Sequence, residues 1–264
     1  MHTYVIAECG SCHDGDLKKA QRLIDYAKEC GADAAKFQFW SSAERLADRR
    51  KAADYLDIYR RYQIPMEWLG TLRAHCYHVG IQFMCTTYLP EDIHVVEPYV
   101  ERFKVASFEA DDLPFVDAHA GFGKPIIRSC GMGAQPYQGR QQTLDLLCIS
   151  SYPAPQDALN LHRLRGNRFV GLSDHTLSWL TGAVAVGAGA CILEKHISLA
   201  STSADNPDVN HSLTADVDSR DGFRKYVWAV RQAEEMYGNP YITGDEDRIH
   251  ECEMEMARYK VVRP

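Results

Sequence analysis

Residues 4–39 read YVIAECGSCHDGDLKKAQRLIDYAKECGADAAKFQF, and this stretch decides the fold. Residues 4–7 form a short apolar run typical of a buried strand, and residues 34–39 form a second one. Between them, apolar side chains recur at helical spacing after Asp16 and stop at Gly31, a residue that commonly ends a helix. The stretch therefore predicts a strand, a helix and a second strand, which is the unit that builds parallel sheets.

The same unit repeats along the chain. We expect further strands at residues 81–86, 102–106, 125–129, 144–149, 169–172 and 191–194, and helices at residues 66–78, 90–99, 113–120, 158–164, 177–186 and 220–237. Residues 41–64 form a charged helical excursion, and the crossover at residues 135–142 is short. Eight strands alternating with eight helices predict an α/β fold, a single-domain (β/α)8 TIM barrel. A doubly wound sheet is the alternative, but no glycine-rich dinucleotide fingerprint follows the first strand.

Composition and charge exclude several classes of protein. The chain has 264 residues, with 29 Lys and Arg against 36 Asp and Glu, for a formal net charge of −7. Without a basic block, this balance lacks the electrostatic footprint of a nucleic-acid binder. No apolar run approaches the roughly 20 residues that a membrane helix needs, and the first residues lack the regions of a signal peptide. We expect a soluble cytoplasmic enzyme that binds neither nucleic acid nor a membrane.

Cysteine usage agrees with that expectation. The chain has nine cysteines, an odd number spread along its length, which favours reduced thiols over a disulfide framework. Cys9-Gly10-Ser11-Cys12 spells C-x-x-C, a pattern that redox and zinc sites use. Because no second pair at metal-binding spacing exists in the sequence, we favour packing of small residues at a strand end.

Polar residues lie in the carboxyl-terminal part of each predicted strand or directly after it. In a barrel of this class, the carboxyl ends of the strands and the loops after them build the active site, and polar groups at such positions are costly unless paired or used. In strand order they are Glu8 and His13; Lys36 and Gln38; Thr86 and Thr87; Lys104, Ser107 and Glu109; Ser129; Ser150, Ser151 and Tyr152; Ser173, Asp174 and His175; and Glu194, Lys195 and His196. A single polar side chain at such a position more often forms a structural hydrogen bond, whereas polar side chains at the ends of all eight strands indicate a site.

Two histidines suggest a metal site. His175 and His196 follow adjacent predicted strands, so their imidazoles can converge on one divalent cation. Carboxylates such as Glu8, Glu194 or Asp208 can complete a mixed shell suited to Mn²⁺, Mg²⁺ or Zn²⁺. The alternative is that both histidines are hydrogen-bonded to neighbouring carboxylates.

A second group of residues is cationic and hydroxylic. Lysine supplies a point charge and hydroxyls supply donors, which together suit a phosphate. Glu109, close to both groups, is a candidate acid/base or orienting carboxylate, or it forms a salt bridge to one of the lysines. The members of the phosphate group are Lys36, Thr86, Lys104, Ser107 and Ser129.

Several segments resemble motifs of the sialic acid synthases, the phosphoenolpyruvate-condensing (PEP-condensing) N-acetylneuraminate synthase family. The family motifs are IAE-G-x-NHNG, GADAVKFQ, K-I-x-SGE, STGM, YP-P, GYSDHT, EKH and PDH-x-FSL. In that order, the matching segments are residues 6–15, 31–38, 104–109, 129–132, 152–155, 171–176, 194–196 and 207–213. The matches run in order along nearly the whole chain, so together they are highly specific.

The resemblance implies a (β/α)8 barrel that condenses PEP with an aldehyde sugar to give a 2-keto-3-deoxy acid and phosphate. It implies a divalent metal, Mn²⁺ or Mg²⁺, which polarises the aldehyde while C3 of PEP attacks it. His175 and His196 would be the metal ligands. The residues implied to hold PEP are Lys36, Thr86, Lys104, Ser107, Ser129, Ser150 and Ser173, and those implied to shape the sugar pocket and handle protons are Glu8, Glu109, Tyr152, Glu194 and Asp208.

The chain also departs from the family pattern. Members usually carry a C-terminal antifreeze-like domain; here we expect a barrel at residues 1–244, a tail at 245–264 and no such domain. Phe108 stands where the family has Gly, and Ser150 where it has Asn. The added bulk beside Glu109 predicts an altered acceptor pocket, so the expected acceptor is a sugar or sugar-like aldehyde other than plain N-acetylmannosamine. A homodimer is expected because family barrels associate.

Two other functions fit the same sequence. One keeps the barrel and the metal but catalyses pyruvate aldol addition or metal-assisted hydrolysis. The other is a catalytically silent paralogue that binds PEP or a sugar and regulates a partner. The intact Lys104-to-Glu109 and Ser173-to-His175 segments argue against a silent protein.

Overall fold

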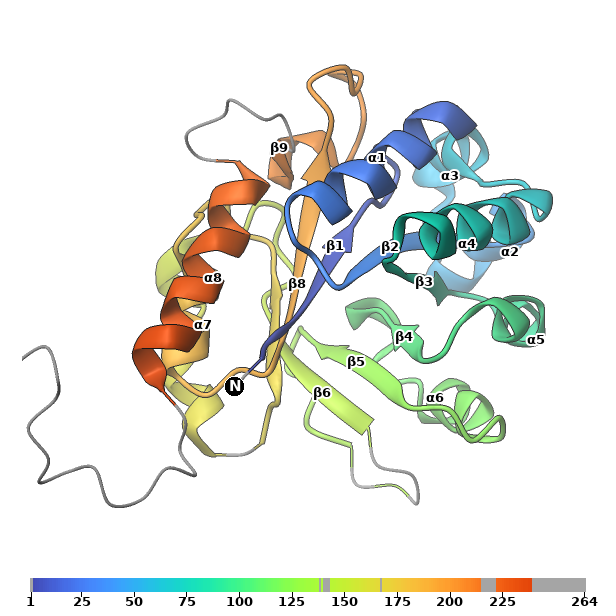
Figure 1. Cartoon of the computed structure of the whole chain (residues 1–264). Coiled ribbons are helices and arrows are strands. Elements are labelled where there is room, and N and C mark those ends of the chain that lie inside the picture. Colours follow the sequence, from blue (N-terminus) through green and yellow to red (C-terminus); the bar gives the residue numbers. More distant parts are fainter. Residues whose placement is uncertain (1, 138, 140–142, 167, 215–221, 239–264) are drawn as a thin grey trace, which may run out of the picture.

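Eight parallel strands form a closed barrel in the computed structural model, which describes residues 2–137, 139, 143–166, 168–214 and 222–238. Each strand pairs with the next, and β1 also pairs with β8, which closes the ring (Figure 1). The expected TIM barrel is therefore confirmed. The strands are β1 (Tyr4–Glu8), β2 (Ala34–Phe39), β3 (Gln82–Thr87), β4 (Phe103–Val105), β5 (Ile126–Cys130), β6 (Thr143–Cys148), β7 (Gly171–Asp174) and β8 (Ile192–Ser198), and a short β9 (Leu213–Thr214) pairs with β8.

Helices cover the outside of the barrel. The excursion expected at residues 41–64 is helical and forms α2 and α3, which pack on each other beside the opening. Ser42 caps α2 by accepting from the Arg45 amide, because a serine hydroxyl satisfies an amide that the first turn leaves free. The helices are α1 (Leu17–Glu29), α2 (Ala43–Arg50), α3 (Leu56–Tyr62), α4 (Glu67–Val79), α5 (Ile93–Val96), α6 (Leu113–Ala120), α7 (Thr181–Gly187) and α8 (Phe223–Tyr237).

Two crossovers differ from the regular alternation that the sequence predicts. Between β5 and β6, the described residues contain no helix, in line with the short crossover seen in the sequence. Between β6 and β7, the helix expected at residues 158–164 is wrong: two 3₁₀ turns, Gln156–Ala158 and Leu161–Gly166, replace it. Asn160 lies between the turns with φ 44°, a left-handed conformation that no α-helix continues through.

Strand β8 is longer than its apolar run. The sequence predicts it at residues 191–194, but it continues to Ser198, so His196 lies within the strand rather than after it. The ladder sets this side chain beside β1, because Glu8 is in register with His196 on one side and with Lys36 on the other. Thr86 is likewise in register with Lys104, and Ser173 with Glu194. Residues paired in register lie side by side in the barrel wall, so these seven groups meet at its carboxyl end.

Two apolar cores support this arrangement. A small one fills the barrel interior below the polar level, and a larger one lies between the strands and the surrounding helices. None of the described helices is both long and apolar enough to cross a membrane. The first residues of the helix expected at 220–237 and the tail expected at 245–264 lie outside the described residues. The members of the interior core are Ile6, Ala34, Met84, Ile127, Leu146 and Ile192.

Candidate active site

A cavity of about 160 Å³ opens at the carboxyl ends of the strands. Polar side chains line it from all the barrel strands except β3 and β6, and from the segments that follow the strands. Its volume suits a small molecule and its lining is mostly polar. The lining residues are Glu8, Lys36, Gln38, Arg50, Tyr88, Lys104, Ala106, Ser107, Phe108, Ser129, Tyr152, Ser173, His175, Glu194, His196 and Asp208. We call this the donor pocket.

Two lysines and two glutamates form a buried charge network in the donor pocket. Lys36 Nζ lies 2.5 Å from Glu8 Oε2 and 3.7 Å from Glu194 Oε2, and Lys104 Nζ lies 3.5 Å from Glu194 Oε1. All four side chains are at most 6% exposed. Buried charges of this kind are retained only when each has a partner, and here the two signs balance.

The network sets the protonation of its members. Burial raises the pKa of Glu8, and the nearby Glu194 raises it further, although Lys36 opposes both. Burial opposes the positive charge of Lys36, but Glu194 and Glu8 outweigh it and raise its pKa. Burial lowers the pKa of Lys104, and for Glu194 the burial effect is outweighed by Lys104 and Lys36, which lower its pKa. Glu8 therefore takes up a proton more readily than Glu194.

Hydroxyl groups surround the two ammonium groups. Lys36 Nζ donates to Thr86 Oγ1 at 2.9 Å, and Lys104 Nζ donates to Ser129 Oγ at 2.8 Å. Ser107 Oγ accepts from Ser150 Oγ at 2.8 Å. Cationic nitrogens flanked by hydroxyls are the donor set that a phosphate and a carboxylate require.

Three ligand atoms cluster beside the network. His196, Asp208 and His211 each offer one atom, and these atoms lie within 4.8 Å of one another. His196 Nδ1 is buried and has no hydrogen-bond partner among the described residues. His211 Nε2 lies 3.5 Å from Asp208 Oδ1. Two imidazoles and a carboxylate are a donor set that suits a divalent transition metal, so these residues fit the metal that the sequence suggests.

His175 lies next to this cluster rather than in it. Its ring centroid is 5.5 Å from that of His196 and 6.5 Å from that of His211. Its Nδ1 donates to the Ile149 carbonyl at 2.8 Å, which leaves Nε2 as the acceptor nitrogen. Burial lowers the pKa of His175 to about 4, so the ring is neutral at neutral pH. A neutral imidazole held by a backbone carbonyl is oriented as metal-binding histidines are.

Asp208 is positioned by the loop after β1. Its Oδ2 accepts from the Ser11 amide at 2.7 Å and from Ser11 Oγ at 2.8 Å. A Cβ on Gly10 would lie 2.2 Å from the same oxygen, and Gly10 has φ 48°, so only glycine allows this approach. Cys9 and Cys12 flank the loop as buried free thiols, with Cys12 Sγ 3.8 Å from Ser212 Oγ, and pack there as expected.

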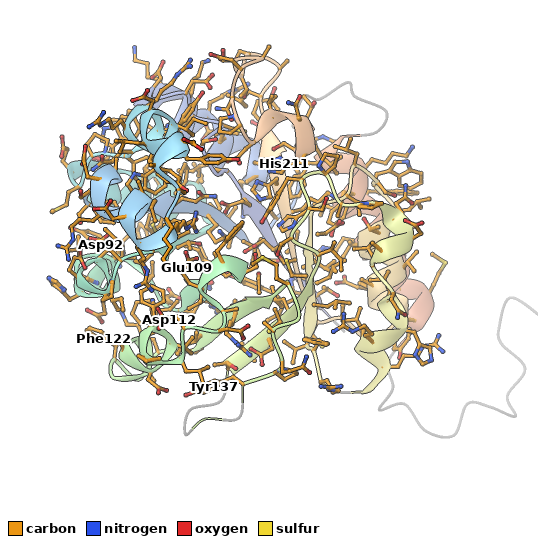
Figure 2. All side chains as sticks on the ribbon, turned by 180° about the vertical axis from the view of Figure 1, so that it is seen from behind. Asp92, Glu109, Asp112, Phe122, Tyr137 and His211 are labelled. Carbon is orange, nitrogen blue, oxygen red and sulfur yellow. The ribbon has the colours of Figure 1, made fainter. Side chains whose placement is uncertain are left out.

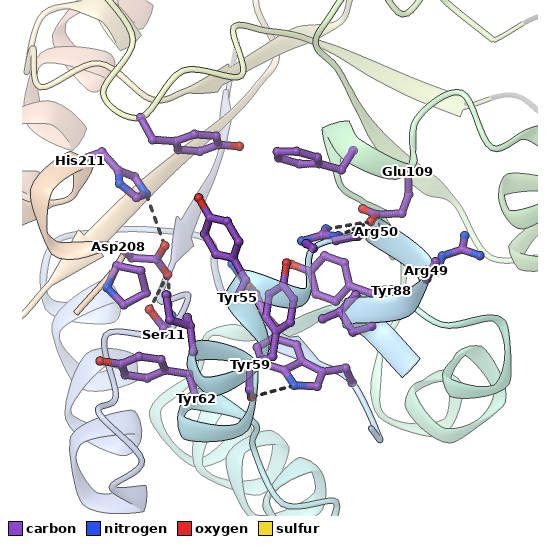
Figure 3. Close-up of a pocket in the computed structure, with 18 of the residues that line it drawn as sticks. Ser11, Arg49, Arg50, Tyr55, Tyr59, Tyr62, Tyr88, Glu109, Asp208 and His211 are labelled. Atoms are coloured by element: carbon purple, nitrogen blue, oxygen red, sulfur yellow. Dashed lines mark hydrogen bonds and ion pairs between the residues drawn. The ribbon is translucent and has the colours of Figure 1, made fainter. Parts of the chain in front are cut away.

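Glu109 belongs to a second, larger cavity. It pairs with Arg50, whose Nη2 lies 2.8 Å and whose Nε lies 2.9 Å from Glu109 Oε1. The salt bridge considered for Glu109 exists, but its partner is this arginine of α2 rather than Lys36 or Lys104. Figure 2 labels Glu109 and Asp112 on the segment after β4, and His211 on the segment after β8. Figure 3 shows Asp208 and His211 on one side of the larger cavity and Arg50 and Glu109 on the other.

With this geometry in place, comparison with known proteins identifies the family. Residues 23–241 match the NeuB family. The chain belongs to the NeuB family.

Individual relatives agree. This chain is 31% identical to the N,N'-diacetyllegionaminic acid synthase of Legionella pneumophila, over 90% of this chain and 74% of that protein. It is 30% identical to the human N-acetylneuraminate-9-phosphate synthase, over 90% of this chain and 72% of that protein. A crystal structure of the N-acetylneuraminic acid synthetase of Leptospira borgpetersenii superposes with a TM-score of 0.81 at 23% identity, covering 98% of this chain and 91% of that one, which supports the fold.

The structure brings together most of the residues that the sequence singles out. Of the residues to which the resemblance gives a role, all line the donor pocket except three: Thr86 and Ser150, which contact lining residues, and Glu109, which lines the larger cavity. Five other strand-end residues line neither cavity: His13, Thr87, Ser151, Asp174 and Lys195. Two residues of the site, Arg50 and His211, were not predicted from the sequence. Arg50 belongs to the charged excursion, which has no strand-end position, and His211 follows Asp208 on a loop. The family motif PDH-x-FSL offered a signal, since its histidine aligns with Val209 and His211 stands in place of its phenylalanine.

Proposed function

We propose that this NeuB-family chain condenses phosphoenolpyruvate with an aldehyde sugar and releases phosphate, giving a nonulosonic acid of the sialic acid kind. C3 of PEP bonds to the aldehyde carbon, water adds to C2, and the resulting tetrahedral centre expels phosphate. The observation that carries the proposal is the pair of buried ammonium groups, Lys36 and Lys104, set among hydroxyls and opposite Glu194. The names of the relatives support the same reaction.

We assign the donor pocket to PEP. Lys36 and Lys104 neutralise its phosphate and carboxylate, and Ser107, Ser129 and Ser173 supply further hydrogen bonds. Thr86 and Ser150 hold Lys36 and Ser107 in place. Preorganised cations and donors of this kind stabilise the charge that develops as the tetrahedral centre expels phosphate, because they need no reorganisation during the reaction.

We assign the metal to His196, Asp208 and His211, with His175, whose ring centroid lies 5.5 Å from that of His196, as a further ligand. When bound, Mn²⁺ or Mg²⁺ supplies Lewis-acid polarisation of the aldehyde oxygen. The sequence resemblance assigns this role to His175 and His196 alone. Asp208 and His211 extend that set because their ligand atoms lie within 4.8 Å of one another and of one from His196.

Carboxylates and one phenol handle the protons. Glu8, whose pKa is raised by burial, takes up a proton more readily than Glu194 and is the group that we assign to exchange a proton with the new hydroxyl or the leaving phosphate. Glu194 stays ionised between the lysines and orients the water that adds to C2. Tyr152 and Glu109 face the acceptor, since both line the larger cavity.

We place the enzyme in the cytoplasm, as a homodimer. The eight cysteines among the described residues are free thiols, which suits a reducing compartment. The dimer follows from the family resemblance. Light scattering after size exclusion measures it directly, and a monomer at micromolar concentration would contradict it.

The test is a condensation assay. The purified chain is incubated with PEP, Mn²⁺ or Mg²⁺ and a panel of aldoses and N-acylhexosamines, and phosphate and product mass are read together. We expect phosphate release that requires both the cation and an acceptor, and a product whose mass equals PEP plus acceptor plus water minus phosphoric acid. His196→Ala and Lys104→Met are expected to lower the rate by at least about 100-fold, as loss of a principal electrostatic group does.

Matched surface variants control for nonspecific effects. His94 and Lys18 are exposed and remote from both cavities, so His94→Ala and Lys18→Met are expected to keep the wild-type rate.

Turnover with pyruvate in place of PEP would support an aldolase instead. Tight PEP binding without turnover across the whole panel would support a silent paralogue. Phosphate release that His196→Ala leaves unchanged would exclude the metal assignment.

A further inference from the structure

The larger cavity adjoins the donor pocket and has the volume of a ligand site. It encloses about 850 Å³, within the range of small-molecule pockets. We call it the aromatic cavity, because seven Trp, Tyr and Phe rings line it, four of them from the segment between β2 and β3. The two cavities share part of their lining, so a molecule can occupy both. The shared residues are Gln38, Arg50, Tyr88, Phe108, Tyr152 and Asp208.

The charged side chains of the aromatic cavity, other than Asp208, cancel in pairs. Arg50 pairs with Glu109 at 2.8 Å, and Arg49 Nη2 lies 2.6 Å from Asp112 Oδ2. The remaining charged side chain among the described lining residues is the carboxylate of Asp208. Along the described lining, therefore, no cation is left without a carboxylate partner, and an incoming anion would have to break a pair.

Aromatic rings provide the rest of the surface. The Arg50 guanidinium lies between the rings of Tyr88 and Phe108, with its Cζ 4.7 and 4.9 Å from their centroids. Stacking on both rings helps to hold this arginine in its pair with Glu109. Tyr55 and Phe108 are 55% and 57% exposed, so their rings are open to the cavity and its entrance. Such faces bury C–H groups and methyl groups of a ligand favourably.

We infer that the aromatic cavity binds the part of the acceptor remote from its aldehyde, and that it selects an uncharged sugar with acylamino or deoxy groups over a phosphorylated one. The inference rests on the proposed function for the identity of the acceptor's aldehyde end. A phosphate dianion would lie beside Glu109 and Asp112 without a free cation to compensate it, whereas acyl methyl groups would pack on the rings. Phe108, on the segment after β4, and Tyr55, on the excursion, are the specificity residues.

The first test compares matched ligands by calorimetric titration in the presence of PEP. The probes are N-acetylmannosamine, which serves as an uncharged model of an acylamino sugar and not as the acceptor itself, and N-acetylmannosamine 6-phosphate. We expect the uncharged sugar to bind at least about 10-fold more tightly, because an unpaired charge in a partly buried site is unfavourable. Equal or tighter binding of the phosphorylated sugar overturns the inference, and so does the absence of binding by either sugar.

A charge variant reverses the preference. Asp112→Asn removes the partner of Arg49 but keeps the cap of α6, because asparagine accepts from the Phe115 amide as aspartate does. We expect the affinity ratio to shift toward the phosphorylated sugar by about 10-fold, since the freed guanidinium can pair with phosphate. Asp111→Asn makes the same charge change on an exposed neighbour and is the control, with an unchanged ratio. An unchanged ratio in Asp112→Asn overturns the charge argument.

A variant that removes an aromatic ring tests whether the rings bind the sugar. Tyr55→Ser removes a half-exposed ring, so the fold is expected to persist, while the affinity for N-acetylmannosamine falls by about 10-fold at an unchanged affinity for PEP. Unchanged sugar affinity overturns the role of the rings. Because these readouts are binding constants, sugar binding without phosphate release would contradict the proposed reaction and leave this inference standing.

Discussion

Replacing Lys195 by methionine tests whether a buried ion pair in the barrel wall stabilises the active site. Lys195 Nζ lies 3.0 Å from Asp174 Oδ2 on the outer side of the barrel wall, and both side chains are fully buried. Asp174 and Lys195 are in register on β7 and β8, and each is flanked in sequence by groups of the donor pocket. Their ion pair therefore fixes the register that turns His175 and His196 into the pocket.

The magnitude follows from burial. Lys195→Met leaves the Asp174 carboxylate without its cation, and breaking a buried pair by removing one partner costs about 3–5 kcal/mol. Hydrogen bonds from Thr176 and Thr181 to Asp174 persist, which places the expected loss at the lower end, about 3 kcal/mol. For a domain of this size that corresponds to a fall in Tm of roughly 6–12 °C.

The assay is urea unfolding followed by circular dichroism, with a double-mutant cycle. Asp174→Leu combined with Lys195→Met removes both charges, and we expect it to recover at least about 1 kcal/mol relative to the sum of the single variants. Lys18→Met on the surface is expected to stay within about 0.5 kcal/mol of wild type. A Lys195→Met loss below about 1 kcal/mol, or strict additivity in the cycle, would refute the reasoning.

Three further predictions concern other parts of the molecule. Burial lowers the pKa of His119 to about 4 from 6.5, so the unfolded chain takes up a proton first as pH falls, and the unfolding free energy should drop between pH 6.5 and 4. His119→Gln should flatten a pH series of urea midpoints by up to about 3 kcal/mol over that window, and an unchanged slope would contradict this. Gly10→Ala should displace Asp208 and lower the affinity for Mn²⁺ by at least about 10-fold in a metal titration, because the added Cβ would lie 2.2 Å from Oδ2; wild-type affinity would show that the loop adapts. Ser150→Ala should raise the KM for PEP only about 2- to 5-fold, less than Ser107→Ala, since its hydroxyl acts through that serine, and a reversed order of the two effects would contradict the arrangement.

The periodicity of the chain was enough to predict the barrel and the level of its site. Each apolar run predicts a strand, and a polar residue directly after the run lies at the carboxyl end of that strand in any closed parallel barrel. Glu8 and Ser173 follow from this rule alone, whereas Lys36 and Lys104 lie within β2 and β4 and stand out as charges among apolar strand residues. The break at Asn160 could not be predicted from periodicity, because a single left-handed residue splits a helical pattern into two turns without changing the apolar spacing.

The contacts of the aromatic cavity could not be predicted in the same way. Arg50 meets Glu109 across 59 residues of sequence, and the meeting depends on how α2 packs against the segment after β4. Helical periodicity in residues 41–64 indicates helices but not the side of the barrel opening on which they lie. His211 escaped for a related reason: its loop approaches His196 only because β8 extends to Ser198 and pairs with β9.

The two cavities differ in how their specificity is encoded. The donor pocket is built from residues in register on the barrel strands, where a change of one side chain leaves a buried charge unpaired, so it tolerates little variation. The aromatic cavity is built from an excursion and loop segments whose side chains are partly exposed, so substitutions there change what binds without unfolding the barrel. The chemistry of the donor pocket can therefore be predicted from strand-end motifs. The specificity for the acceptor depends instead on the charge balance and the rings of residues 41–64 and 108–112.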